Sequence, residues 1–426
     1  MVREKRKVLI ITYYWPPSGG AGVQWWLKFA KYLPEFGIEP IILTVDPKYA
    51  SYPQRDESLE KDIHSELKVF KTKSVEPLNV LSGLFGKKNV PYGGFTNVNK
   101  KSLFQVFLRF IRGNFFIPDA RVGWNKYAYK KAKDLIAEFN IETVVTTSPP
   151  HSTQLVGLKL KKNLDIQWIA DFRDPWTDIY YYKDLLHTNL AKRIDKKKEK
   201  EVLEKADKVL TVGNTLKNEL QLKSERENIH ILSNGFDEND FEGQIENKPE
   251  KFTITYTGTF SDHYNISTFI KVCKKLKEDG KDFIIRFVGN ISEQKHLDFK
   301  NAGLEENLEI VGYVTHQKSI EYLYNSSALL LVIPEIEGNK SILTGKLFEY
   351  LAAGKPIIGI GPKDGDSAKI IQECEAGKCF DYNQEKELKE FLEKVIELNS
   401  KFQINKEALE RFTRRNLTKE LHYILS

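Results

Sequence analysis

The sequence predicts an α/β protein made of two domains, each built around a doubly wound parallel sheet. In both halves of the chain, short apolar runs alternate with longer segments of helical spacing. Uninterrupted apolar runs are typical of strands buried on both faces of a parallel sheet. The chain has 426 residues, which is too long for one ordinary hydrophobic core. We expect one domain over residues 1–232 and a second over 233–405, with a final helix at 406–426 that returns to the first.

Composition limits the classes of function. With 41% hydrophobic and 29% charged residues, the chain reads as a soluble globular protein. A net charge of +6 permits anionic partners, such as nucleotide phosphates or an acidic membrane surface, but is too small for a nucleic-acid-binding protein. Three widely spaced cysteines argue for a reducing compartment and against disulfides or structural zinc. We find no apolar run long enough to span a membrane and no signal-peptide cleavage site, so we expect a cytoplasmic protein.

The first strand–helix–strand unit is readable directly. An apolar run at 7–14 precedes a glycine-rich turn, a helical pattern to Leu33 and a second apolar run at 40–45. Gly19 and Gly20 lie in that turn, where small residues let backbone N–H groups approach an anion at a helix N-terminus. An ordinary tight turn is the alternative, because the glycines are not spaced as in the dinucleotide-binding fingerprint GxGxxG. The absence of this fingerprint also disfavours a dinucleotide-dependent dehydrogenase.

Polar loops follow two later strands of the first half. SPPHS contains His151, and DFRDPW contains Asp171 and Arg173. Ligands of open α/β sheets bind at the carboxyl ends of strands, so these three residues are candidates for positioning an acceptor. A structural hydrogen bond for the histidine and an internal Asp/Arg ion pair are the alternatives.

The composition of three other segments in the first part of the chain predicts their structure or location. Residues 100–116 form a basic amphipathic pattern that fits a helix on an anionic membrane surface, or a helix packed on its own domain. The charged, mostly basic run 183–208 predicts a helical segment with a solvated face. The polar stretch 230–251 predicts a linker between the domains.

The second half repeats the alternation. A strand is expected at 252–257 and another at 329–333, and the latter leads through a polar loop to a helix over 344–353. Gly354 stands where a helix C-cap belongs, and a further strand follows at 357–360.

Two residues of that helix suggest a nucleotide site. Lys346 lies in the first turn, where the helix N-terminus attracts phosphate. Glu349 is three residues later on the same face. A carboxylate accepts two hydrogen bonds at once, which suits the diol of a ribose. A surface Lys/Glu pair is the alternative.

The segment KLFEYLAAGKPII that contains both residues resembles the donor-binding segment of glycosyltransferase family 4. Members of this family are retaining sugar transferases of the GT-B fold, in which two Rossmann-like domains face each other across a cleft. The resemblance places Glu349 on the donor ribose and His151 near the sugar, because SPPHS and DFRDPW resemble acceptor-side loops of the family. The chain departs from the family at Ser341, where many members carry a glutamate, and at Thr259, near which they often place an arginine. The cationic role would then pass to Lys340 and Lys346.

The resemblance implies an enzyme that moves a sugar from a nucleotide-sugar to a glycan or lipid-linked acceptor with retention, as in bacterial polysaccharide assembly. It implies no cofactor, no metal and no nucleic-acid partner. Asp364-Gly365-Asp366 is the one metal-binding candidate that we considered. Peripheral contact with an anionic membrane at its inner face is an open alternative to a purely cytoplasmic location. The expected catalytic residues are His151, Asp171 and Arg173, and the expected donor-binding residues are Gly19, Gly20, Gly258, Thr259, Lys340, Thr344, Lys346 and Glu349. Two other functions remain open: a catalytically inactive scaffold subunit with this fold, and a nucleotide-sugar 2-epimerase.

Overall fold

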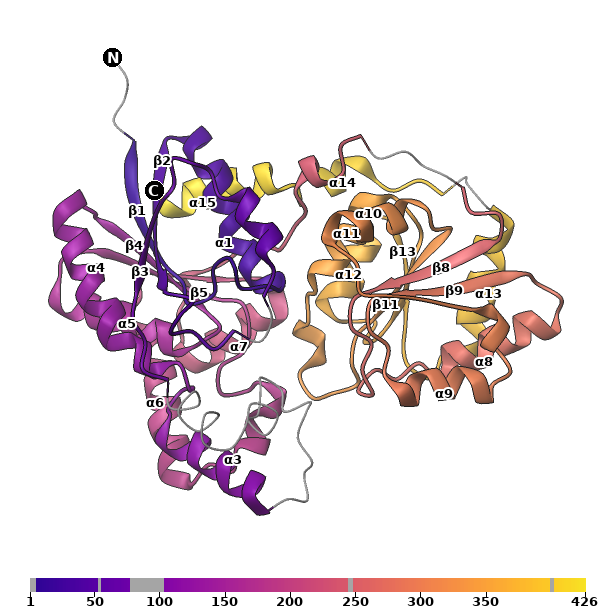
Figure 1. Ribbon diagram of the computed structural model, residues 1–426, viewed down its shortest axis with the longest axis horizontal. Coiled ribbons are helices and arrows are strands. Elements are labelled where there is room, and N and C mark those ends of the chain that lie inside the picture. Colours follow the sequence, from indigo (N-terminus) through magenta and orange to yellow (C-terminus); the bar gives the residue numbers. More distant parts are fainter. Residues whose placement is uncertain (1–4, 53–54, 77–102, 244–247, 399–401) are drawn as a thin grey trace. The chain divides into compact units, whose positions relative to one another are not determined.

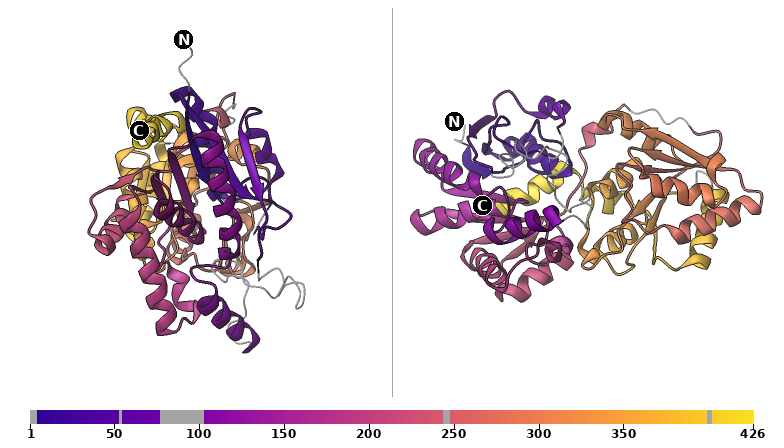
Figure 2. Two further views of the ribbon diagram at one scale, coloured as in Figure 1. Left: turned by 90° about the vertical axis from the view of Figure 1, so that its left-hand side faces the viewer. Right: turned by 60° about the horizontal axis from the view of Figure 1, so that its bottom comes forward.

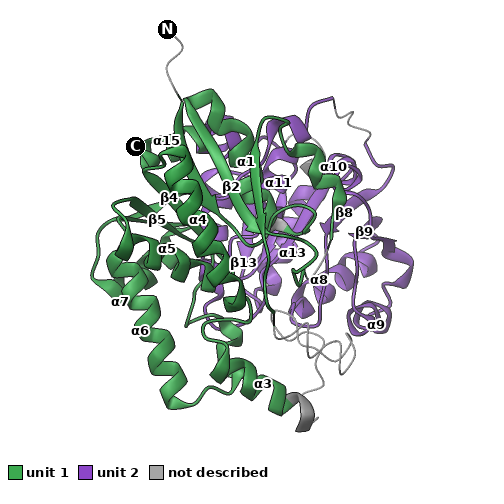
Figure 3. Ribbon diagram, turned by 60° about the vertical axis from the view of Figure 1, so that its left-hand side comes forward, with its two compact units in different colours: residues 1–233, 418–426 green, residues 234–417 purple. Residues whose placement is uncertain are grey.

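The computed structural model describes residues 5–52, 55–76, 103–243, 248–398 and 402–426. The chain forms two compact units, coloured separately in Figure 3: unit 1 contains residues 1–233 and 418–426, and unit 2 contains residues 234–417. The end of the chain differs from the expected single helix over 406–426. It forms α14 (Lys406–Glu410) and α15 (Arg414–Leu425), and residues of α15 from Thr418 onward belong to unit 1.

Unit 1 contains a seven-stranded sheet in the order β3-β2-β1-β4-β5-β6-β7, and every strand pair is parallel. The strand order reverses between β1 and β4, as in a doubly wound sheet. Its strands are β1 (Arg6–Ile11), β2 (Ile38–Val45), β3 (Lys68–Thr72), β4 (Thr143–Ser148), β5 (Gln167–Phe172), β6 (Lys208–Thr211) and β7 (Ile229–Ile231). Its helices are α1 (Ala21–Tyr32), α3 (Leu103–Phe115), α4 (Asn125–Phe139), α5 (Ser152–Asn163), α6 (Asn189–Lys205) and α7 (Asn214–Ser224), followed at the end of the chain by most of α15 (Figure 1).

Unit 2 contains a six-stranded parallel sheet in the order β10-β9-β8-β11-β12-β13. The order reverses between β8 and β11, so the two units share one topology. Its strands are β8 (Phe252–Thr257), β9 (Phe283–Val288), β10 (Leu308–Gly312), β11 (Ala328–Val332), β12 (Ile357–Ile360) and β13 (Gly377–Phe380). Its helices are α8 (Ser267–Glu278), α9 (Glu293–Asn301), α10 (His316–Tyr324), α11 (Gly345–Ala353), α12 (Asp366–Glu373) and α13 (Glu385–Leu398), together with α14.

The strand β11 shows why the apolar runs are uninterrupted. Leu329 and Leu331 pack with Phe348 of α11 in one core cluster. The alternate residues Leu330 and Val332 pack in a second cluster, which includes residues of α8, α9 and α13. Successive side chains of a strand point to opposite faces, and helices cover both faces of the sheet in each unit (Figure 2). All five residues of β11 are therefore buried, and all five are apolar.

The structure corrects one prediction about this framework. The stretch expected as a linker from residue 230 begins inside β7, the edge strand of the unit 1 sheet. The helix α6 has the solvated face expected of the charged run, and its other face buries Asp195 and Glu199. Among the described residues, no helix combines the length and the apolar character needed to cross a membrane.

Candidate functional site

The loops that follow β8 and β11 in unit 2 lie at the point where the strand order reverses. Ligands of doubly wound sheets bind at this point, outside the carboxyl ends of the strands. Gly258 follows β8 with φ +94°, a backbone conformation that favours glycine. A Cβ atom there would be 2.7 Å from Cε of Lys346. Gly258 therefore leaves the space that the Lys346 side chain occupies, while the neighbouring Thr259 is exposed.

Lys346 lies in the first turn of α11, as predicted. Its Nζ atom donates a hydrogen bond to the Tyr256 hydroxyl at 2.9 Å and lies 4.8 Å from the centre of that ring. Burial lowers the pKa of Lys346 to about 8, and the nearby Glu349 opposes the shift. The lysine remains largely charged at neutral pH. It can add its positive charge to that of the helix N-terminus.

The N-terminus of α11 lacks a side-chain cap. Thr344 occupies the N-cap position, but its hydroxyl makes no capping hydrogen bond. Its Oγ1 atom is buried and has no hydrogen-bond partner among the described residues. The first N–H groups of a helix have no partner within the helix and commonly bind anions. Thr344, Lys346 and this helix end can together hold a phosphate.

Glu349 shares one face of α11 with Lys346. Its side chain is 22% exposed, and its Oε1 atom is 3.9 Å from Nδ1 of His316. The other ring nitrogen of His316 is 3.5 Å from Oδ2 of Asp240. Burial raises the pKa of Glu349, while His316 and Lys346 act in the opposite direction. The histidine ring thus lies between the carboxylates of Asp240 and Glu349.

Two further residues considered for the donor site, Lys340 and Ser341, are already paired with other groups of the protein. Lys340 forms an exposed ion pair with Asp364, so an anion would have to compete with that carboxylate. Ser341 donates its hydroxyl to the Gly338 carbonyl at 2.9 Å. Within the parts of the chain that the structure describes, no group of three or more histidine, cysteine or acidic residues could hold a metal ion.

In unit 1, Gly19 and Gly20 follow β1 at the corresponding reversal of strand order. Gly20 has φ +101° at the N-cap of α1 and is exposed. Two residues later, the Gly22 carbonyl accepts a hydrogen bond from Nη1 of Arg173 at 2.8 Å. The glycine turn is therefore tied to the polar loop that follows β5.

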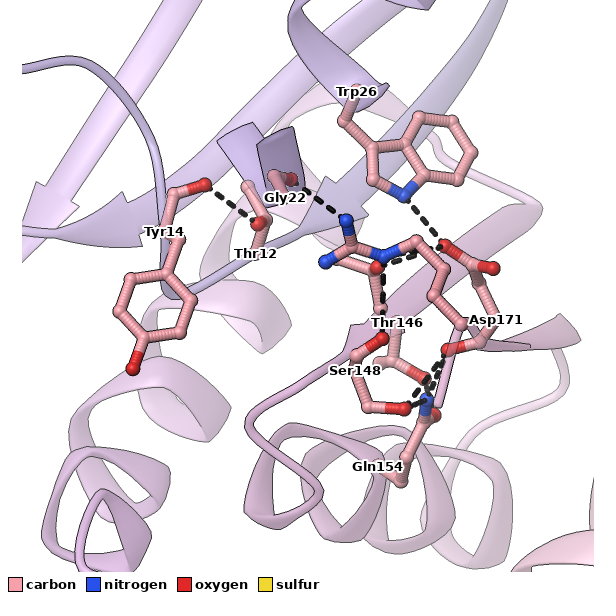
Figure 4. Close-up of polar contacts among 10 residues, drawn as sticks. Thr12, Tyr14, Gly22, Trp26, Thr146, Ser148, Gln154 and Asp171 are labelled. Carbon is pink, nitrogen blue, oxygen red and sulfur yellow. Dashed lines mark hydrogen bonds and ion pairs between the residues drawn. The ribbon is translucent and has the colours of Figure 1, made fainter. Parts of the chain in front are cut away.

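Asp171, which we expected to contact an acceptor, is completely buried. Its Oδ2 atom accepts a hydrogen bond from Nε1 of Trp26 at 2.9 Å (Figure 4). The same atom accepts a second hydrogen bond from Oγ1 of Thr147 at 2.7 Å. Burial raises its pKa, and Arg173 opposes that shift most strongly. Because solvent does not reach this carboxyl group, Asp171 is suited to positioning its neighbours and not to contacting a substrate.

Arg173 makes contacts with three segments of unit 1. Its Nε atom donates to the Ser148 carbonyl at 3.2 Å and lies 4.0 Å from Oδ2 of Asp171. Together with the bond to Gly22, these contacts tie the first turn of α1 to the ends of β4 and β5. The ion pair considered as an alternative in the sequence is present, and it fixes the loop geometry.

His151 directly precedes α5 and stacks on Trp176, with ring centres 5.2 Å apart and an interplanar angle of 14°. Its side chain is buried, and burial is the main cause that lowers its pKa to about 4, although Asp119 opposes the shift. The imidazole is therefore neutral at pH 7. Nε1 of Trp176 donates to Asp195 at 2.8 Å, which connects the stacked pair to the buried face of α6.

Sequence reasoning missed Tyr256, His316, Trp176 and Asp195 as parts of these sites. Tyr256 lies within an apolar strand and Asp195 within a charged run, so local pattern marks neither of them. DFRDPW, which includes Trp176, was recognised as a polar loop. Its proximity to His151 depends on the pairing of β4 with β5.

Comparison with known protein families gives two matches. Residues 237–415 match the family described as glycosyl transferases group 1. Residues 93–240 match the family described as Glycosyltransferase Family 4. The two matches together extend over residues 93–415. The first covers nearly all of unit 2, and the second covers the later part of the N-terminal segment of unit 1. No curated protein matches the chain significantly.

Several solved structures resemble the chain over almost its whole length. Sucrose-phosphate synthase from Thermosynechococcus elongatus has a TM-score of 0.65 and 14% identity, covering 99% of this chain and 98% of that one. A glycosyltransferase from Rickettsia africae has a TM-score of 0.61 and 16% identity, with coverages of 99% and 98%. HepE of Anabaena, solved in complex with UDP, has a TM-score of 0.62 and 12% identity, with 99% of each chain covered. At these identities the likeness concerns the fold.

Proposed function

Because this chain belongs to the family 4 glycosyltransferases of the GT-B fold, we propose that it transfers a sugar from a nucleotide-sugar to a glycan or lipid-linked acceptor with retention of configuration. Unit 2 binds the nucleotide-sugar and unit 1 binds the acceptor. The observation that carries this assignment is the group formed by Lys346, Glu349 and the uncapped N-terminus of α11. A nucleoside diphosphate is the ligand that presents both phosphate oxygens and a ribose diol.

In this proposal the diphosphate lies at the N-terminus of α11. Lys346 and the helix N–H groups stabilise the negative charge that grows on the departing diphosphate in the transition state. Glu349, which lies beside His316, accepts hydrogen bonds from the ribose. Positive charge from the protein takes the place that a metal ion has in other transferases, so we propose that the reaction needs none.

In unit 1, His151 is the residue that we propose to contact the transferred sugar or the acceptor. Its low pKa keeps the imidazole neutral, so it can donate one hydrogen bond and accept another at pH 7. Arg173 and Asp171 act as positioning residues, because their contacts fix the ends of β4 and β5 against α1. Bacterial polysaccharide assembly is the setting that we propose for the reaction.

We also propose peripheral membrane contact through α3, for which the sequence left a membrane surface and packing on its own domain as alternatives. The basic residue Arg109 is buried. Among the side chains of α3 that the structure describes, the exposed ones are apolar and include Phe107, Phe110 and Phe115. Insertion of these rings into the interfacial region would bring a lipid-linked acceptor to the enzyme. Loss of vesicle co-sedimentation in Phe107→Ser/Phe110→Ser, with unchanged thermal stability, is the expected result. Equal sedimentation of both proteins would exclude this surface.

The proposed donor site is tested by thermal unfolding with UDP, GDP, ADP and CMP. A ligand at 100 times its Kd should stabilise the folded protein by about 2.7 kcal/mol. We expect stabilisation by one nucleotide, its loss in Glu349→Ala and its retention in Glu306→Ala, whose side chain is 90% exposed. If no nucleotide stabilises the wild-type protein, the transferase assignment fails and a scaffold subunit becomes the better explanation.

A further inference from the structure

Stacking on Trp176 sets the orientation of the His151 imidazole. The histidine side chain is 7% exposed, and neither of its ring nitrogens has a hydrogen-bond partner among the described residues. The indole is nearly parallel to the imidazole, with its centre 5.2 Å away, whereas the Phe172 ring is tilted and its centre is 6.3 Å away. Burial lowers the pKa of the imidazole, and Asp119 and the backbone of Pro175 oppose this shift. The ring nitrogens therefore remain available to a ligand, and the plane of Trp176 decides where they point.

Asp195 of α6 holds the indole in this plane. Its Oδ1 atom accepts a hydrogen bond from Nε1 of Trp176 at 2.8 Å, and its Oδ2 atom accepts one from the Tyr182 hydroxyl at 2.9 Å. The side chain of Asp195 is completely buried. Burial raises its pKa to about 6, and the two hydrogen bonds oppose the shift. The carboxyl group is therefore mainly ionised at pH 7, and an ionised acceptor binds an N–H donor more strongly than a neutral one does.

The chain next to Trp176 is anchored to α6 by a separate contact. Thr177 donates its hydroxyl to Oε2 of Glu199 at 2.6 Å. Glu199 lies one turn after Asp195 on α6 and is also buried, and Lys223 of α7 pairs with its carboxylate at 2.7 Å. The position of this segment is thus fixed by groups other than Asp195, so the Asp195 carboxylate acts on the indole ring itself.

The second oxygen of Asp195 serves a different part of unit 1. The Tyr182 ring that it binds stacks on His187, with ring centres 4.2 Å apart. His187 lies against α3, where a Cβ atom at Gly113 would be 3.3 Å from Cδ2 of the histidine ring. The bond to Tyr182 therefore supports the packing of α3, whereas the bond to the indole supports the stacked pair. Substitutions can remove the two bonds one at a time.

We propose that Asp195 positions His151 for its ligand, by holding the Trp176 indole in the plane on which the imidazole stacks. A buried carboxylate is costly to desolvate, and replacing a buried charged group by an apolar side chain of similar volume is often neutral or stabilising. The orientation that Asp195 gives to the indole therefore explains the carboxylate better than stability does. This inference rests on the proposed function, in which His151 contacts the transferred sugar or the acceptor, and it adds a residue that the ligand does not touch.

The experiment follows the titration of the His151 imidazole by NMR, in the full-length protein with isotope-labelled histidine. The signal that is missing in His151→Phe identifies the ring, which should titrate at about 4 in the wild type. In Asp195→Leu the indole loses its acceptor and the imidazole is released into water. We expect the midpoint to rise from there by about one pH unit or more, toward 6.5. Loss of a nearby negative charge would by itself lower the midpoint, so a rise reports the release of the ring.

Two variants test whether the bond to the indole is the cause. Tyr182→Phe is the matched control, because it removes the other hydrogen bond to the same carboxylate, and it should titrate like the wild type. Asp195→Asn should also stay close to the wild type, since the amide oxygen can accept from the indole and the amide N–H can donate to the tyrosine hydroxyl. If Asp195→Leu does not fold, Trp176→Phe removes the same hydrogen bond from the other side and should raise the midpoint.

A midpoint that stays at the wild-type value when the bond between Asp195 and Trp176 is removed would overturn the proposal. An equal rise in Tyr182→Phe would also overturn it, because the effect would then come from general loosening of the core. Thermal unfolding with UDP, GDP, ADP and CMP tests the donor site in the same proteins. A raised midpoint without stabilisation by any nucleotide would support the positioning role and refute the donor site. Nucleotide stabilisation with an unmoved midpoint would refute the positioning role alone.

Discussion

The ammonium group of Lys346 lies over the ring of Tyr256 and donates a hydrogen bond to its hydroxyl. The lysine is therefore held in place before any ligand arrives, by a contact that is weaker than an ion pair. A carboxylate in the position of this hydroxyl would have bound the lysine more tightly and competed with phosphate. The tyrosine contact keeps the charge both ordered and available.

The first prediction concerns pH and nucleotide affinity. Because the pKa of Lys346 is about 8, its charge is progressively lost as pH rises from 7 to 9. If the lysine contacts the diphosphate, affinity should fall over this range by as much as tenfold per pH unit once the lysine is deprotonated. Titration calorimetry at several pH values measures the effect. Lys346→Arg should give a flatter profile, since arginine stays charged, and a flat wild-type profile would contradict contact between Lys346 and phosphate.

The second prediction concerns Gly258. In Gly258→Ala the new methyl group meets both an unfavourable φ of +94° and Cε of Lys346 at 2.7 Å. We expect a loss of about 1–3 kcal/mol of unfolding free energy from backbone strain, together with weaker nucleotide binding. Gly280→Ala is the matched control, because Gly280 also has a positive φ but nothing lies within 4 Å of its Cβ position. Equal nucleotide affinity in the two variants would show that the displaced lysine is irrelevant to binding.

The third prediction concerns acid stability. The pKa of His151 is lowered from 6.5 to about 4, so the folded protein binds fewer protons than the unfolded chain between these values. Stability is therefore lost as pH falls from 6.5 to 4, by about 3 kcal/mol from this group. His151→Phe keeps an aromatic ring against Trp176 and should lose less stability over the same range. Urea unfolding at both pH values gives the difference, and parallel losses in the two proteins would contradict the assignment.

The fourth prediction concerns the buried carboxyl group of Asp171. Asp171→Ala leaves the indole N–H of Trp26 and the hydroxyl of Thr147 without their acceptor and leaves Arg173 without its nearest carboxylate. We expect a loss of about 3–5 kcal/mol, as found when one partner of a buried ion pair is removed. Thr147→Val removes one donor to the same carboxylate and should cost about 1 kcal/mol. Denaturant unfolding measures both, and a loss in Asp171→Ala no larger than that in Thr147→Val would show that the buried network contributes little.

The fifth prediction concerns metal ions. If Lys346 and the N-terminus of α11 balance the charge of the diphosphate, the protein should bind the nucleotide without a metal ion. The nucleotide affinity in excess EDTA should then be within about twofold of the affinity with Mg²⁺. Thermal unfolding in the two buffers makes the comparison. A requirement for Mg²⁺ would show that a metal ion carries the charge that the proposal gives to the protein.

Much of the framework was predictable from local pattern. The strand, loop, helix and strand from β11 to β12 follow the expected boundaries to within one or two residues, and Gly354 has the left-handed conformation expected of a C-cap. The edge strands β3 and β13 were not predicted. Most of their residues are exposed or half-buried. A strand at the edge of a sheet has only one neighbouring strand, so fewer of its residues need to be apolar and the apolar run is harder to recognise in the sequence.

The sequence by itself determined the two doubly wound sheets and the placement of Lys346 and Glu349 on one face of α11, because strand burial and helix spacing are set by residues close together in the chain. Tertiary structure alone decided which polar residues are buried. Asp171 was a candidate substrate contact and is buried, whereas α3, which the sequence allowed either on a membrane surface or packed on its own domain, buries Arg109. Both outcomes depend on partners far away in the chain, such as Trp26 for Asp171 and the Leu185 carbonyl near Gly113 for α3. The local sequence pattern cannot predict such contacts, because they form only when strands pair and helices pack.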